Sequence, residues 1–70
     1  MNARRSSLGP RLYTLRTERN LTQQQVADAL HVCRQTYSNY ERDLRQPSLE
    51  MLQQLAAFYH LSLGELLSGS

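Results

Sequence analysis

A run of polar side chains recurs at helical spacing in the middle of the chain. A helix would align five of them on one ridge, namely Arg34, Gln35, Ser38, Asn39 and Arg42. None of the five is acidic or apolar. Arginine can bond O6 and N7 of guanine together, and glutamine or asparagine can do the same with N6 and N7 of adenine. The ridge therefore suits the reading of base edges, although a solvated helix surface is the ordinary alternative.

The opposite side of this segment carries larger and less polar residues. They recur at intervals of four, three and four residues, as Cys33, Tyr37, Tyr40 and Leu44. This spacing predicts an inward stripe on a helix that runs to about residue 43, with Cys33 in the cap position. Glu41 lies next to the stripe, away from the polar ridge.

Two helical segments precede the ridge. The first has Leu8, Leu12 and Leu15 on one face and Pro10 in its first turn, and it is expected to end near residue 20. Thr22 and Gln25 form a capping-box pattern that begins a second helix over 22–30, with apolar positions Val26, Ala27 and Leu30. Only two or three residues then separate this helix from the ridge-bearing helix. Such spacing is typical of a helix-turn-helix, which presents its second helix outward.

Two further helices are expected after the ridge. Pro47 breaks the chain, and Ser48 caps a fourth helix whose apolar face is Leu49, Leu52, Leu55, Ala56 and Tyr59. Ser62 with Glu65 is a second capping box, and it opens a short fifth helix that Gly69 ends. No segment alternates as a strand would. The sequence therefore predicts a compact all-α domain of five helices.

Size and charge bound the class of protein. The 70 residues make one domain at most, which we divide into a flexible arm over 1–7 and a domain over 8–70. All eight basic residues are arginine and lie between Arg4 and Arg45, with four acidic residues among them, so this part carries a net charge of +4. The remainder carries −2. The basic part favours an anionic partner, with ordinary charge scatter as the alternative.

Composition also disfavours several classes. The longest apolar run, residues 55–59, is too short to cross a bilayer, and no membrane association is expected. The single cysteine excludes an internal disulfide and favours a reducing cytoplasm. No Cys/His cluster has metal-ligand spacing and no catalytic spacing is present, so neither a metal, a cofactor nor an enzyme activity is expected.

The order of these elements resembles the Cro/repressor-type (lambda-repressor-like, Xre) helix-turn-helix family over about residues 8–67. The resemblance lies in residues 12–16, 20–23, 26–32, 34–42, 47–49 and 61–66. It implies a five-helix fold that binds double-stranded DNA. Carried over by position, the residues facing bases are Arg34, Gln35, Ser38 and Asn39, and those facing the DNA backbone are Gln23, Arg42 and Arg45. Arg16 and Glu41 match a structural salt bridge of the family.

Two residues depart from the family pattern. His31 stands where the family usually has glycine in the turn, and a left-handed backbone there would strain a histidine. Cys33 stands where the family often has Ser or Thr, and we interpret it as a small, half-buried cap substitute. A pH-sensing role for His31 and redox control through Cys33 are sharper hypotheses. The thiol would be more reactive at a helix N-terminus, because that position lowers its pKa.

We therefore expect a bacterial or phage transcriptional regulator, a repressor, that acts as a homodimer on an inverted-repeat operator. Two copies would place their recognition helices ~34 Å apart in successive major grooves. Arg4 and Arg5 of the arm could add DNA contacts, or the arm could be an untethered tail. The possible dimer interface is formed by Phe58, Leu63, Leu66 and Leu67, unless the three leucines are all core. The alternative function is an antitoxin-like or accessory module whose main role is to bind a protein partner.

Overall fold

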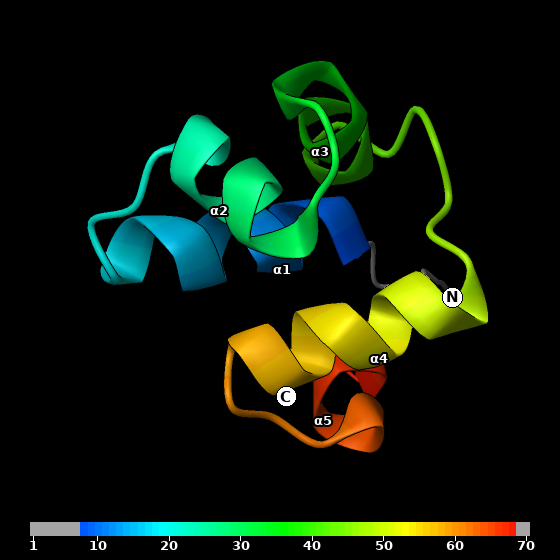
Figure 1. Cartoon of the computed structure of the whole chain (residues 1–70). Coiled ribbons are helices and arrows are strands. Elements are labelled where there is room, and N and C mark those ends of the chain that lie inside the picture. The colour runs from blue at the N-terminus through cyan, green and yellow to red at the C-terminus, as the bar shows by residue number, and fades with distance from the viewer. Residues whose placement is uncertain (1–7, 69–70) are drawn as a thin grey trace.

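The computed structural model describes residues 8–68, and within them the chain forms five helices and no strand (Figure 1). These helices are α1 (Leu8–Glu18), α2 (Gln23–Leu30), α3 (Arg34–Glu41), α4 (Leu49–Phe58) and α5 (Leu63–Ser68). The predicted all-α, five-helix fold is therefore confirmed. Helices α1 and α3 each end about two residues before their expected ends. The arm over 1–7, with Arg4 and Arg5, and the stop at Gly69 lie outside the described residues.

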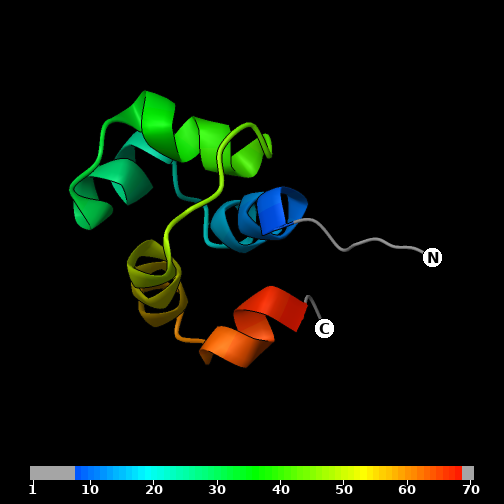
Figure 2. The ribbon, with the colours of Figure 1, turned by 90° about the vertical axis from the view of Figure 1, so that its right-hand side faces the viewer.

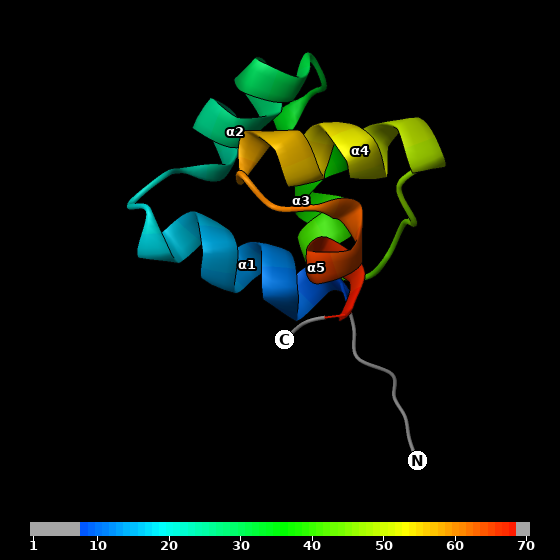
Figure 3. The same cartoon turned by 90° about the horizontal axis from the view of Figure 1, so that it is seen from below.

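Helix α1 lies at the centre of the arrangement. It packs against α3 on one side and against α5 on the other, while α2 packs on α3 and α4 on α5. Figure 2 shows α1 between the α2–α3 pair and the α4–α5 pair. Seen from below, in Figure 3, α4 is drawn above α5, and α5 lies beside α1. The fold thus holds α3 from its inner side and leaves its outer side open.

The predicted helix starts are confirmed at three positions. Thr22 Oγ1 accepts from the backbone N–H of Gln25 at 3.1 Å, and the Gln25 side chain accepts from the Thr22 N–H at 2.8 Å. Ser62 and Glu65 form the same reciprocal pair, at 3.0 and 2.8 Å. Ser48 Oγ accepts an N–H bond from the first turn of α4 at 3.1 Å. Each bond satisfies a donor that the helix itself leaves without a partner.

Helices α1 to α4 all end in the same way. One or two residues after the end of each helix comes a residue with a left-handed backbone, with φ between 58° and 63°, and none of the four is glycine: Asn20, His31, Asp43 and His60. At α2, the His31 N–H donates to Asp28 O at 3.2 Å and the Val32 N–H donates to Ala27 O at 3.0 Å. This is the bonding pattern of a Schellman motif. The left-handed conformation expected at His31 is therefore present.

An apolar residue follows each of these four left-handed positions. Leu21, Val32 and Leu61 pack against the core, as the residue after a Schellman motif commonly does. Leu44 is 65% exposed instead. The expectation that Leu44 belongs to the inward stripe of α3 is wrong, because α3 ends at Glu41 and the chain turns away from the core before Leu44.

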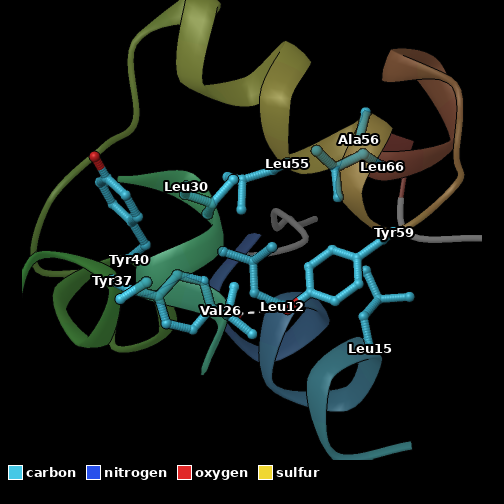
Figure 4. Close-up of a cluster of buried hydrophobic side chains, with 11 residues drawn as sticks. Leu12, Leu15, Val26, Leu30, Tyr37, Tyr40, Leu55, Ala56, Tyr59 and Leu66 are labelled. Atoms are coloured by element: carbon cyan, nitrogen blue, oxygen red, sulfur yellow. Dashed lines mark hydrogen bonds between the residues drawn. The ribbon is translucent and has the colours of Figure 1, made fainter. Parts of the chain in front are cut away.

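One core joins all five helices (Figure 4). Its buried residues are Leu12, Leu15, Val26, Ala27, Leu30, Tyr37, Tyr40, Leu55, Ala56, Tyr59 and Leu66. The hydroxyls of Tyr37 and Tyr59 satisfy each other across the core at 2.8 Å, and burial raises the pKa of both. Leu49, expected on the buried face of α4, is the first residue of that helix and is 63% exposed, so this expectation is wrong.

Within residues 8–68, no helix has both the length and the apolar character needed to cross a membrane.

Candidate nucleic-acid interface

The turn between α2 and α3 fixes the direction of α3. Its first residue, His31, has φ 63° and ψ 38°, and its last, Cys33, is extended with φ −77° and ψ 157°. Between them Val32 packs against the core. These three residues turn the chain within one short connection, so that α3 packs against α2 with one side and shows its far side to solvent.

A buried ion pair holds α3 against α1. Arg16 Nε donates to Glu41 Oε2 at 2.6 Å, and Arg16 Nη2 donates to Glu41 Oε1 at 3.1 Å. The side chains are only 13% and 4% exposed. Arg16 Nη1 also donates to Leu21 O at 2.8 Å, just before α2. The arginine therefore braces α1, α3 and the entry to α2 at one point.

Glu41 is the acidic residue of α3, and it is turned inward. Burial would raise the pKa of this carboxyl, but hydrogen bonds from Arg16, Gln23 and Tyr37 outweigh burial and hold the pKa below its ordinary value. The bond from Gln23 Nε2 to Glu41 Oε1 measures 3.0 Å. Because this carboxylate is ionised and enclosed, the outer face of α3 carries no acidic group.

The outer face of α3 carries three of the four residues expected to contact bases. Arg34 and Gln35 are exposed and Asn39 is half-buried. Gln35 Nε2 donates to Asn39 Oδ1 at 3.1 Å. This bond leaves Gln35 with a free carbonyl oxygen and one free N–H, which is the pair of groups that adenine N6 and N7 require.

Ser38 does not share this face. It is 8% exposed and lies at the edge of the buried arc of α3, next to Glu41 on the helix surface. The arc is broad because α3 packs against both α1 and α2. The expectation that Ser38 contacts bases is therefore corrected, since helical spacing alone does not give the width of the buried arc.

The residues expected at the DNA backbone lie around this face. Arg42, which follows α3, and Arg45, in the connection to α4, are both exposed. Gln23, the first residue of α2, is half-buried and is bonded to Glu41. Two guanidinium groups thus stand free beside the carboxyl end of α3.

Gly9 and Asp43 form a contact that sequence reasoning missed. The Gly9 N–H donates to Asp43 Oδ1 at 2.9 Å, across 34 residues of sequence. A Cβ on Gly9 would collide with the carbonyl oxygen of Glu41 and lie 2.8 Å from the Asp43 carboxyl carbon. Asp43 therefore directs its charge at the start of α1, where the helix dipole favours an anion. No local pattern could have revealed this pair.

Cys33 is exposed, which corrects its interpretation as a half-buried cap. Its side chain makes no capping bond to α3; its Sγ lies 3.1 Å from Thr36 Oγ1. The hydrogen bond with the Thr36 hydroxyl lowers the pKa of the thiol.

The four residues suggested for a dimer interface have different environments. Leu66 is 1% exposed and belongs to the core, so it cannot contact a second copy. Phe58 and Leu63 are half-buried, and Leu67 is 47% exposed. The alternative that these leucines are core is thus correct for Leu66 alone.

Two short helices joined by a tight turn, with the second helix braced inward and its polar face outward, define a helix-turn-helix DNA-binding domain. The chain belongs to the helix-turn-helix family, whose family model matches residues 12–66. This is the Xre/lambda-repressor-like family that the sequence resembled.

The relatives of this chain include a transcriptional repressor and a transcriptional activator. It is 43% identical over 56 residues to the cryptic phage CTXphi transcriptional repressor RstR of Vibrio cholerae, covering 80% of this chain and 50% of RstR. It is 41% identical over 59 residues to the transcriptional activator BcrR of Enterococcus faecalis, covering 84% of this chain and 29% of BcrR. The chain thus spans half or less of the length of these two relatives.

A solved structure shares the fold. The DNA-binding domain of S. venezulae BldD matches with a TM-score of 0.73 and 31% sequence identity, over 86% of this chain and 90% of that domain.

Proposed function

We propose that this protein is a bacterial or phage transcriptional regulator that acts in the cytoplasm and binds double-stranded DNA in a sequence-specific way. The observation that carries the proposal is the outward face of α3, where Arg34 and Gln35 stand exposed while Glu41 is enclosed by Arg16. Such a face meets no repulsion from phosphates and offers paired donors and acceptors to base edges.

The proposed contacts divide into two groups. Arg34, Gln35 and Asn39 read bases in the major groove, with arginine suited to guanine and the two amides to adenine. The backbone contacts come from residues at the edges of the face, namely Gln23, Arg42 and Arg45. Contacts of the second group set the register on the duplex and carry the dependence of affinity on salt.

The proposed assembly on DNA is a homodimer on an inverted repeat. Leu67 is the exposed apolar residue of α5, with Leu63 half-buried on the same helix and Phe58 at the end of α4. A Leu67→Arg variant tests this surface, because a charge there would raise the dimer dissociation constant. Sedimentation equilibrium would measure it. An unchanged dimer would instead point to the exposed pair Leu44 and Leu49.

Repression is the proposed outcome, because the relative RstR is a transcriptional repressor. A promoter–reporter fusion carrying the selected operator distinguishes repression from activation. A fall in reporter signal with rising protein supports repression. A rise in reporter signal would indicate that the protein is a transcriptional activator, as its relative BcrR is named.

Selection of bound sequences from a random duplex pool at ~150 mM salt tests DNA binding itself. We expect an inverted repeat with half-sites about one helical turn apart. Affinity for it should fall with salt at a slope of about −0.9 per phosphate neutralised. A folded protein that enriches no motif would contradict the proposal and favour the partner-binding module.

A further inference from the structure

Two side-chain contacts tie the carboxyl end of α3 to α1. The first is the ion pair of Glu41, the last residue of α3, with Arg16 at 2.6 Å. The second joins Asp43 Oδ1 to the backbone N–H of Gly9 at 2.9 Å. Gly9 and Arg16 lie on the same side of α1, about two helical turns and about 10 Å apart along its axis. A single contact would let the end of α3 pivot on α1, whereas two separated contacts fix its direction.

Asp43 is also the last anchored side chain before a free connection. It has a left-handed backbone, with φ 58°, two residues after α3, and the following N–H, of Leu44, donates to Asn39 O at 2.9 Å. Within residues 8–68, no hydrogen bond joins residues 45–47 to any other residue in that range. The chain is held again at Ser48, which caps α4. The bond of Asp43 to α1 therefore sets the point and the direction from which the connection leaves.

Two exposed arginines flank Asp43, with Arg42 directly before it and Arg45 two residues after it. Both are proposed to contact the DNA backbone. A carboxylate between them would repel phosphates, but the bond to Gly9 turns this one toward the positive end of the α1 dipole. The same bond fixes the backbone from which the arginines project. A backbone that is ordered before binding loses less conformational entropy when the arginines meet phosphates.

We propose that Asp43 is a positioning residue for the DNA backbone contacts of Arg42 and Arg45. Its bond to the Gly9 N–H holds the carboxyl end of α3 and the connection after it, so that both arginines meet phosphates in register. The inference rests on the proposed function, because it takes the two arginines as backbone contacts. Asp43 thus contributes indirectly to affinity, while discrimination at the base pair read by Arg34, at the opposite end of α3, does not depend on it.

The test compares Asp43→Gly with Asp43→Asn, both of which remove the charge. Glycine accepts the left-handed backbone and removes the side-chain acceptor. Asparagine also tolerates that backbone and keeps an Oδ1 that can accept from the Gly9 N–H. The difference between the two variants therefore separates the bond from the charge. His60→Gly is the matched control, because it removes an exposed side chain at another left-handed position, with φ 61°, after α4.

The charge and the bond have opposite effects on DNA binding. Asp43→Asn should bind every duplex at least as tightly as the parent protein, because it removes a charge that repels phosphates. Asp43→Gly should bind every duplex about twofold to tenfold more weakly than Asp43→Asn, as expected when the ordering from one hydrogen bond is lost. Its salt slope should be shallower by about 0.9 for each arginine that no longer meets its phosphate. Discrimination at the base pair read by Arg34 should be equal in the two variants, and His60→Gly should match the parent protein.

Three measurements separate positioning from a general loss of stability. Circular dichroism sets a temperature at which all variants are folded, and the affinities are measured there. Nuclear magnetic resonance relaxation of the free protein reports on the backbone amides of Leu44 and Arg45. Their order parameters should fall in Asp43→Gly and be kept in Asp43→Asn. In a background with Arg42→Ala and Arg45→Ala, the two Asp43 variants should bind DNA alike.

Several results would overturn the inference. Equal affinities and salt slopes for Asp43→Gly and Asp43→Asn would show that the bond contributes nothing to DNA binding. A difference that persists without Arg42 and Arg45 would show that Asp43 acts elsewhere. If Asp43→Gly does not fold, Gly9→Ala should show the same losses relative to the parent protein, because its Cβ would displace the Asp43 carboxylate. If Arg42→Ala and Arg45→Ala change neither affinity nor salt slope, the proposed backbone contacts fail independently of Asp43.

Discussion

Arg16 Nε lies 2.6 Å from Glu41 Oε2, and this contact joins α1 to the last residue of α3 across 25 residues of sequence. Arg16→Ala would leave the enclosed carboxylate without its main partner. We expect a loss of up to about 3–5 kcal/mol in the free energy of unfolding, measured by urea denaturation followed by circular dichroism. Glu18→Ala, which removes an exposed carboxylate at the end of α1, is the control and should change the value by less than about 0.5 kcal/mol. A loss under about 1 kcal/mol for Arg16→Ala would show that the pair behaves as a surface pair.

The same carboxylate makes stability depend on pH. The pKa of Glu41 is lower in the folded protein than its ordinary value of 4.5, so the folded state binds fewer protons than the unfolded state below that pH. Its contribution is therefore complete above about pH 4.5 and is lost as the pH falls through the folded pKa. Urea denaturation from pH 7 to pH 2 should show a steeper loss for the parent protein than for Glu41→Gln. A smaller slope remains in the variant, because the pKa of Glu65 is also lowered. Parallel curves would contradict this role.

Two glycines should respond to alanine in opposite ways. Gly9→Ala places a methyl group against the Glu41 carbonyl and the Asp43 carboxylate, and we expect a destabilisation of about 1–3 kcal/mol. Gly64 lies in α5, and a Cβ added there would meet no atom nearer than Ser62 Oγ, at 4.0 Å. It should stabilise by up to about 0.5–1 kcal/mol, because alanine favours a helix over glycine. Thermal unfolding of the two variants compares them directly, and equal signs would refute the close approach at Gly9.

The left-handed backbone at His31 predicts a stabilising substitution. His31→Gly removes the Cβ that disfavours φ 63°, and we expect a gain of about 0.5–1 kcal/mol after the entropy cost of glycine. Ala29→Gly, two residues earlier in α2, is the matched control and should lose about 1 kcal/mol. A loss at both positions in thermal unfolding would mean that the His31 side chain contributes more than its strain costs.

Local features of this fold were predictable from sequence, and long-range ones were not. The Thr22–Gln25 and Ser62–Glu65 boxes involve residues three apart, so their spacing alone predicts their bonds. The burial of Ser38 and the exposure of Leu44 depend on how widely α1 and α2 cover α3, which periodicity does not encode.

The sequence at the helix ends contains a pattern from which the left-handed positions could have been predicted. Each left-handed position is an Asn, His or Asp followed directly by a leucine or valine, as at Asn20–Leu21 and His60–Leu61. These residue types tolerate positive φ better than most. The contacts of Gln23 in α2 with Glu41 and Arg34 in α3 had no such local pattern, because they join residues 18 and 11 positions apart on two different helices.

The most direct test of the central claim is the affinity of Arg34→Ala and Arg45→Ala for the selected operator and for its single-base-pair variants. Arg34→Ala should cost about 1–3 kcal/mol on the operator and relax preference at one base pair. Arg45→Ala should weaken binding to every duplex alike and reduce the salt slope by about one. An equal loss on every duplex for Arg34→Ala would contradict the claim that the exposed face of α3 reads DNA sequence.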